Sequence, residues 1–222
     1  MKTSLSQPGD DQATAKQTLR SRMRRTRSAL ARDTAARAAH AAADHLLAIP
    51  ELDDAATVGL YAAFDDELDT QPLADGLRAR GIVVAYPRIV PPALGLVFHL
   101  VHGADALEPG PFGIAQPSAH AEVVALDQLA ILIVPGLAFD DRGGRLGWGK
   151  GYYDTTLTHG SRPLCVGYAH ACQLVPEVPL ASHDVLMDFV ITDAGVIRAS
   201  ARARRVRSHP GVHGNGIEEP AS

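Results

Sequence analysis

Residues 129–154 read LAILIVPGLAFDDRGGRLGWGKGYYD, and this stretch decides the fold that we expect. Its first part, 129–136, is an apolar run that ends in Pro-Gly, which is typical of a buried strand. A glycine-rich loop follows, and the pattern then predicts a helix from Tyr152 to about His159. In open α/β sheets, ligands bind beyond the carboxyl ends of the strands. The stretch therefore predicts an α/β fold with a ligand site in this loop.

Working outward, the rest of the chain alternates between apolar runs and helix-forming segments. Residues 14–47 contain neither Gly nor Pro and predict one long or broken helix, and a shorter helix is expected to stop at Gly81. Segment 110–117 is expected to be a loop. Further strands are predicted at 56–64, 82–87, 94–101, 164–169 and 188–197. Because these runs are apolar on both faces, the sheet should be mixed, largely parallel and flanked by helices.

The domain boundaries follow from composition. We expect a single α/β domain over residues 13–198. Residues 1–12 are polar and predict a disordered leader. Residues 199–222 contain almost no large apolar side chains and predict a disordered tail rich in Arg and Gly, because such a segment has little to bury.

Composition excludes several classes of function. The net charge of −4 gives no general argument for nucleic-acid binding, so we expect no nucleic-acid partner. The start of the chain lacks the apolar region of a signal peptide, and no apolar run is long enough to cross a membrane, which predicts a cytoplasmic protein. Cys165 and Cys172 are expected to be reduced thiols. The ten histidines form no zinc motif, and no G-x-S-x-G nucleophile is present.

The glycine loop admits more than one interpretation from its residues alone. From Gly144 it reads G-R-L-G-W-G-K, the spacing of a P-loop, but Gly151 follows where a P-loop has the Ser or Thr that contacts Mg²⁺. Glycines let a backbone approach phosphate oxygens closely, and Arg145 and Lys150 add two cations. Asp154 then takes the place of the missing hydroxyl as a metal ligand. The alternative is a loop without a ligand, in which Asp154 only caps a helix.

A family resemblance favours the first interpretation. The segment VPGLAFDDRGGRLGWGKGYYD (134–154) resembles the signature of the 5-formyltetrahydrofolate cyclo-ligase family. Other segments match that family in the same order: KQTLR (16–20), LYAAFDDELDT (60–70), YPRI (86–89), FGIAQP (112–117) and QLVPEVPLASHDVLMDFVIT (173–192). The resemblance spans about residues 16–192. It implies a fold like those of the sugar isomerases and coenzyme A transferases.

The resemblance also implies an activity and a set of ligands. The reaction would convert 5-formyltetrahydrofolate, possibly polyglutamylated, into 5,10-methenyltetrahydrofolate with consumption of ATP and a requirement for Mg²⁺. Arg145 and Lys150 would take part in catalysis, and Asp154 and Asp184 would bind the metal. ATP would contact Lys16, Gln17, Thr18, Leu19, Arg20, Arg145, Leu146, Gly147, Trp148, Gly149, Lys150, Gly151, Tyr152 and Tyr153. The folate would contact Tyr61, Ala62, Phe64, Glu67 and Tyr152.

Without the resemblance, two of these sites would be assigned differently. Lys16 and Arg20 lie four residues apart on a helix with many arginines, which alone indicates a solvated basic face. Glu67 alone indicates an acidic helix start with Asp69 as the cap. Two other functions also stay open: an ATP-independent sugar-phosphate isomerase or coenzyme A transferase of the same fold, and a nucleic-acid binder that uses the arginines. We expect a monomer or weak dimer.

Overall fold

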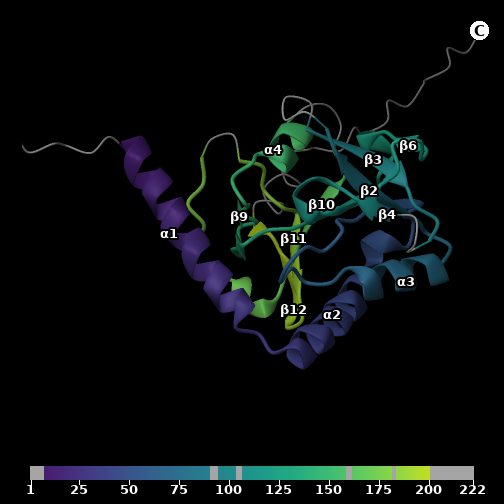
Figure 1. The fold of residues 1–222 in the computed structure, drawn as a ribbon. Coiled ribbons are helices and arrows are strands. Elements are labelled where there is room, and N and C mark those ends of the chain that lie inside the picture. The colour runs from purple at the N-terminus through teal and green to yellow at the C-terminus, as the bar shows by residue number, and fades with distance from the viewer. Residues whose placement is uncertain (1–7, 91–94, 104–106, 159–161, 182–183, 201–222) are drawn as a thin grey trace, which may run out of the picture.

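The centre of the molecule is an eight-stranded sheet with the strand order β12-β11-β10-β7-β1-β2-β3-β6 (Figure 1). The computed structural model describes residues 8–90, 95–103, 107–158, 162–181 and 184–200. Strands β11, β10, β7, β1 and β2 pair in parallel, whereas β12, β3 and β6 are antiparallel to their neighbours. The predicted mixed, largely parallel sheet is confirmed. The sheet strands are β1 (Thr57–Gly59), β2 (Val83–Ile89), β3 (Leu96–Leu100), β6 (Val123–Val124), β7 (Ile131–Val134), β10 (Leu164–Tyr168), β11 (Phe189–Thr192) and β12 (Gly195–Arg198).

The two faces of the sheet are covered differently. Alternate residues of a strand point to opposite faces, and in β7 Ile131 and Leu132 accordingly belong to two separate apolar clusters. Helices α2 (Arg32–Leu47) and α3 (Gln71–Ala79) pack against the first face, and a stripe of alanines lets α2 approach it closely. The second face is covered in part by Phe139 and by the short helix α4 (Tyr152–Leu157), whose Leu157 joins the second cluster.

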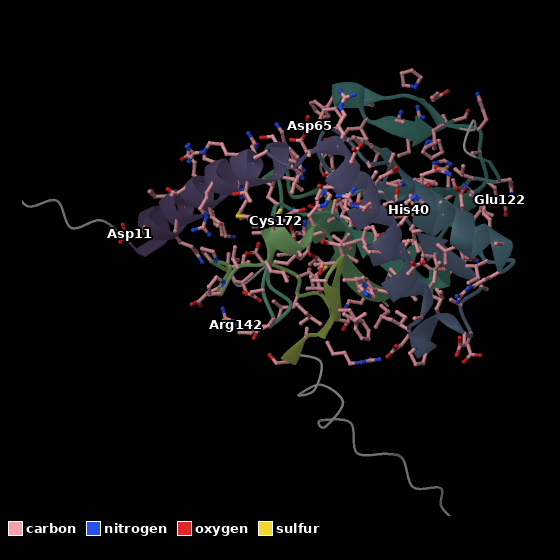
Figure 2. The ribbon with its side chains drawn as sticks, turned by 90° about the horizontal axis from the view of Figure 1, so that it is seen from below. Asp11, His40, Asp65, Glu122, Arg142 and Cys172 are labelled. Atoms are coloured by element: carbon pink, nitrogen blue, oxygen red, sulfur yellow. The ribbon has the colours of Figure 1, made fainter. Side chains whose placement is uncertain are left out.

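Helix α1 (Pro8–Ser28) packs on neither of these clusters. Its Leu19 and Met23 join a third apolar cluster with Leu146 and Val178. This cluster includes part of the small hairpin formed by β8 (Ala138–Phe139) and β9 (Arg145–Leu146). Figure 1 shows α1 beside β9, and Figure 2 shows α1 extending away from α2, which carries His40. The helix is therefore docked on the glycine-rich segment rather than on the central sheet.

The segment 14–47, predicted as one long or broken helix, is broken into two helices, because the chain is extended at Ala31. Two other sequence predictions need correction. Helix α1 begins at Pro8, so residues 8–12 are helical and do not belong to a disordered leader; proline suits a first helical turn. Segment 110–117 is not only a loop: it holds the 3₁₀ turn η4 (Pro111–Gly113) and β5 (Ala115–Pro117), which pairs with β4 (Leu107–Pro109).

Other differences are smaller. Strand β1 is shorter than the run at 56–64, and the region 188–197 is a hairpin of β11 and β12. Cys165 and Cys172 are free thiols, as predicted, and burial raises the pKa of Cys165 to about 11. Within the described residues, no helix has the length and apolar character that crossing a membrane requires. The predictions for residues 1–7 and 201–222 lie outside the described part of the chain. The described part of the chain also holds the 3₁₀ turns η1 (Pro50–Leu52), η5 (Leu126–Gln128) and η6 (Ala171–Gln173).

Candidate active site

A cavity of about 410 Å³ lies where α1, the glycine-rich loop and the segments after β1 and β7 meet. This volume is in the range of small-molecule binding sites. Most of the residues predicted from the sequence line it. They are Lys16, Arg20, Tyr61, Ala62, Phe64, Glu67, Arg145, Leu146, Gly147, Trp148, Gly149, Lys150, Gly151, Tyr152, Tyr153, Asp154 and Asp184.

Three predicted ATP contacts are not among the residues that line the cavity. Gln17 and Thr18 are exposed on α1, and Leu19 is buried in the third apolar cluster. Helical geometry explains this difference, because Lys16 and Arg20 are four residues apart and share a face, while the residues between them point elsewhere. Both Lys16 and Arg20 are partly buried, so the alternative of a solvated basic face is wrong for these two residues.

The shape of the glycine-rich loop depends on its glycines. A Cβ atom on Gly147 would lie 2.8 Å from an Nη atom of Arg145, so a larger residue would displace that guanidinium. Gly151 has a φ of 73° and is the N-cap of α4, a conformation that favours glycine. Helix α4 has six residues and ends at Leu157, before the predicted His159. The cations and the loop backbone, more than a helix dipole, therefore shape this end of the cavity.

Asp140 holds the start of this loop. Its carboxylate is fully buried and accepts hydrogen bonds from the backbone N–H groups of Arg142 (3.0 Å), Gly144 (2.8 Å) and Val178 (2.8 Å). Three backbone donors are enough to satisfy an ionised carboxylate away from water. One side chain thus joins the glycine loop to the segment that leads to Asp184.

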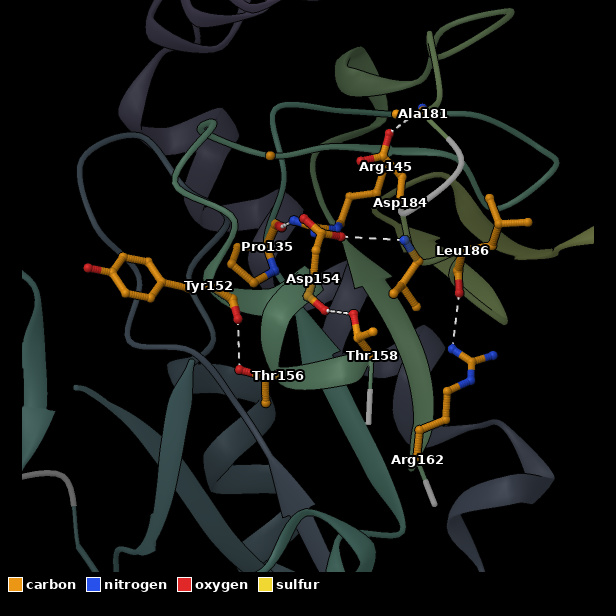
Figure 3. A network of polar contacts seen from close by, with 12 residues as sticks. Pro135, Arg145, Tyr152, Asp154, Thr156, Thr158, Arg162, Ala181, Asp184 and Leu186 are labelled. Atoms are coloured by element: carbon orange, nitrogen blue, oxygen red, sulfur yellow. Dashed lines mark hydrogen bonds and ion pairs between the residues drawn. The ribbon is translucent and has the colours of Figure 1, made fainter. Parts of the chain in front are cut away.

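The predicted cations and carboxylates form two ion pairs. Arg145, whose side chain is 5% exposed, donates to Asp154 Oδ1 at 2.9 Å, and the N–H of Val185 donates to the same oxygen at 3.4 Å (Figure 3). Lys16 Nζ lies 2.6 Å from Asp184 Oδ2, which also accepts from the N–H of Ala181. Asp154 and Asp184, far apart in sequence, are therefore brought to one end of the cavity.

Helix α1 contacts this end of the cavity through polar groups as well. Arg20 Nε donates to the carbonyl of Gly147 at 3.0 Å, and the amide of Gln12 donates to the carbonyl of Leu180. Lys150 is exposed, and its ammonium lies 5.9 Å from the ring centroid of Phe112. The two predicted catalytic cations thus differ: Arg145 is buried and paired, and Lys150 is open to solvent.

The other end of the cavity is aromatic and contains Glu67. Trp148 Nε1 donates to Glu67 Oε1 at 3.0 Å, and the N–H of Phe64 donates to Oε2 at 3.2 Å. Burial is the largest influence on this carboxyl group and raises its pKa above the usual value. Asp69 accepts from the N–H of Gln71 at the start of α3, so Asp69 does act at that helix end while Glu67 faces the cavity.

Sequence reasoning missed the residues that complete the wall. The segments YPRI (86–89) and FGIAQP (112–117) contain several of them, but nothing in these segments marks an individual residue as part of a wall. The pattern of apolar residues alone does not separate a cavity wall from a core. The additional lining residues are Pro87, Ile89, Leu96, Phe112, Ile114, Gln116 and Pro135.

The described residues of the protein offer few ligands for a divalent metal. Among the residues that the structure describes, no three His, Cys, Asp or Glu side chains form a metal-binding group. Mg²⁺ often uses one or two carboxylates together with substrate phosphates and waters. Asp154 and Asp184 at the cationic end fit that pattern, provided that a polyphosphate substrate supplies the other oxygens.

The fold and the cavity define an α/β enzyme whose site combines a cationic glycine loop with an aromatic end that contains a carboxylate. Residues 12–193 match the model of the 5-formyltetrahydrofolate cyclo-ligase family, and the chain belongs to this family. A 5-formyltetrahydrofolate cyclo-ligase from Escherichia coli K12 is 36% identical over 178 residues, which are 78% of this chain and 98% of that protein. The Haemophilus influenzae cyclo-ligase is 32% identical, covering 79% and 97% of the two chains.

A solved structure agrees with this assignment. The Aquifex aeolicus 5,10-methenyltetrahydrofolate synthetase has a TM-score of 0.74 and 28% identity, with 92% of this chain and 96% of that chain covered. The family predicted from the sequence motifs is therefore confirmed, and so is the enzyme class.

Proposed function

We propose that this enzyme converts 5-formyltetrahydrofolate into 5,10-methenyltetrahydrofolate, with ATP as the phosphoryl donor and Mg²⁺ as its companion ion. One observation carries the proposal: a cationic glycine loop and a carboxylate in an aromatic wall meet in a single cavity. A nucleoside triphosphate needs the cationic loop and a pterin needs the aromatic wall with its carboxylate, and a reaction between the two ligands requires these environments to adjoin. The names of the relatives support the overall reaction, whereas the roles of individual residues are our inference.

The need for ATP follows from the chemistry of the substrate. A formamide oxygen is a poor leaving group, so its direct displacement by nitrogen 10 would be slow. Transfer of the γ-phosphoryl group to that oxygen forms an O–P bond and breaks the bond to ADP. Nitrogen 10 then attacks the formyl carbon, loses its proton, and the oxygen leaves as phosphate. The products are the methenyl compound, ADP and phosphate.

In this proposal the protein supplies position and charge rather than a nucleophile. Lys16, Arg20, Arg145 and Lys150 would neutralise the phosphates, and the N–H groups from Gly147 to Gly151 would contact phosphate oxygens. Asp154 and Asp184 would hold Mg²⁺, which neutralises phosphate charge when bound. Before that, Lys16 and Arg145 must share or give up these carboxylates, because each is now ion-paired with one of them.

The folate would occupy the aromatic end. Glu67 presents a carboxylate to which two adjacent N–H donors on the edge of a pterin are complementary. Tyr61, Ala62, Phe64 and Tyr152 would line the same region. The cytoplasmic location and the monomeric or weakly dimeric state stay predictions.

Absorbance spectroscopy tests the proposal directly, because the methenyl product absorbs in the near ultraviolet, away from the substrate. We expect product only when 5-formyltetrahydrofolate, ATP and Mg²⁺ are all present. Equal turnover without nucleotide would reject the ATP-dependent mechanism. Absence of product with all three components present would favour the isomerase or transferase alternative. The family assignment does not favour that alternative.

A further inference from the structure

Arg27, in the last turn of α1, is the largest fully buried side chain that the mechanism above does not use. Only 1% of this residue is exposed. None of its three guanidinium nitrogens has a hydrogen-bond acceptor within the described part of the chain. Burying an arginine charge in this way is costly unless other charges or polarisable groups compensate it. The surroundings of Arg27 should therefore contain a compensating partner.

The aromatic end of the cavity connects Arg27 to such a partner through two successive contacts. The guanidinium carbon of Arg27 lies 5.2 Å from the ring centroid of Trp148, within the range of a cation–π contact. The indole N–H of Trp148 then donates to Glu67 at 3.0 Å. Arg24 also contacts this ring at 4.7 Å, but Arg24 is exposed to solvent, where its charge is screened.

Electrostatics point to the same carboxylate. Burial raises the pKa of Glu67, and the charge of Arg27 acts against that rise. The other charged group that faces Glu67 is Asp65, which raises the pKa further. Tyr61 and Tyr153 also interact with Glu67, and both stay neutral because burial raises their pKa values well above the usual range. His170 lies close enough to feel the charge of Arg27, and burial, with a smaller contribution from that charge, lowers its pKa.

We propose that Arg27 is a positioning residue for the folate site: its buried guanidinium stacks beneath Trp148 and supplies the counter-charge for Glu67. The part of this inference that concerns folate rests on the proposed function. An ionised Glu67 accepts the pterin N–H groups, and a protonated one does not accept them equally. Loss of the Arg27 charge raises the pKa of Glu67. As the pH falls, a variant without this charge would therefore lose folate affinity at a higher pH than the wild type.

The chain offers a direct probe, because Trp148 is its only tryptophan. Its indole donates to Glu67, so protonation of that carboxyl group changes its fluorescence, and a pH titration of the ligand-free protein reports the ionisation of Glu67. In Arg27→Met we expect the midpoint to rise by about one pH unit. Arg27→Lys keeps the charge and should stay near the wild-type midpoint. Glu67→Gln should abolish the fluorescence transition. A transition caused by titration of the nearby His170 would instead persist in this variant.

Arg24→Met is the matched control, since it removes a second cation from the same ring. We expect a change in fluorescence intensity with an unchanged midpoint. The melting temperature of Arg27→Met checks that this variant is folded. Should it fail to fold, Arg27→Gln provides a second neutral variant. A wild-type midpoint in the neutral variants, or an equal shift in Arg24→Met, would overturn the proposal.

Folate binding measured across the same pH range completes the test. For Arg27→Met the dissociation constant should match that of the wild type at high pH, and its rise on acidification should begin about one pH unit higher. If the wild-type protein binds no folate, the proposed function fails while the fluorescence titration still decides the role of Arg27. A pH-independent, uniform weakening in Arg27→Met would indicate that Arg27 only supports packing.

Discussion

At the scale of single residues, Asp154 is the most informative position to change. It is paired with Arg145, and we propose that it also binds Mg²⁺. In Asp154→Asn the amide oxygen still accepts a hydrogen bond, but the negative charge is lost. We therefore expect a higher Mg²⁺ requirement, because hard cations prefer anionic oxygen. We also expect a modest fall in melting temperature, because the buried Arg145 loses its counter-charge. Titration of activity against Mg²⁺ measures the first effect.

The chain contains a matched control for this variant. Asp188 pairs with Arg162 at 3.1 Å, is similarly buried and does not line the cavity. Asp188→Asn should lower the melting temperature in the same way and leave the Mg²⁺ titration unchanged. Superimposable Mg²⁺ curves for Asp154→Asn and the wild type would remove Asp154 from the metal site.

Lys150 tests the cationic end without affecting the fold. It is exposed on the glycine loop, so Lys150→Ala should leave the melting temperature unchanged. If Lys150 follows charge on the transferred phosphoryl group, kcat should fall about 10²–10³-fold, as for loss of other transition-state contacts. Arg22→Ala removes an exposed cation from α1 and should have no such effect. An undiminished kcat in Lys150→Ala would show that this residue is only surface charge.

At the scale of elements, α1 both packs against the glycine-rich segment and contributes side chains to the cavity. Leu19 and Met23 dock it on the hairpin of β8 and β9, while Lys16 and Arg20 reach the cavity. Met23→Asp places a charge in that apolar contact and should release the helix. We expect ATP affinity to fall at least about tenfold while the sheet stays folded.

Limited proteolysis checks this interpretation, because α1 should become sensitive to cleavage in Met23→Asp. Ser21→Asp adds the same charge at an exposed position of α1 and should bind ATP like the wild type. Unchanged ATP affinity in a variant whose α1 is cleaved would show that Lys16 and Arg20 do not contact the nucleotide.

The elements also show which features the sequence could predict. The parallel strands were predictable because β7 and β10 are apolar on both faces. The position of the break between α1 and α2 was not, because Ala29 and Ala31 are good helix formers.

The residues of the site also fall into those that the sequence could predict and those that it could not. The glycine loop and its acidic and basic residues were predictable from their motif. The wall residues Ile89 and Leu96 were not, because their pattern is that of a core. Arg27 could not be separated from the arginines around it either, because nothing in the local sequence indicates that α1 turns this one side chain inward.

At the scale of the whole molecule, the packed core reaches the last strand of the sheet. Ala199 is 2% exposed and follows β12 directly. Removal of residues 203–222 should therefore leave the melting temperature and kcat nearly unchanged. Calorimetry and the absorbance assay measure both quantities. A fall of many degrees would show that this segment packs on the domain or serves an interface.

Removal of residues 195–222 is the corresponding control. It deletes β12 and the buried Ala199, and it exposes the edge of β11. We expect this longer truncation to lose stability, because β11 would lose its antiparallel partner. Equal stability of the two truncated proteins would mean that β12 contributes little to the domain.

The buried carboxylate of Asp140 has a consequence for the kinetics of ATP binding. Because it fixes the N–H groups of Arg142, Gly144 and Val178 together, the start of the glycine loop is ordered before any nucleotide arrives. Little conformational entropy then remains to be lost on binding. In rapid mixing, association of ATP should accordingly follow a single exponential whose rate rises linearly with concentration. A plateau at high ATP concentration would instead reveal a slow rearrangement of the loop.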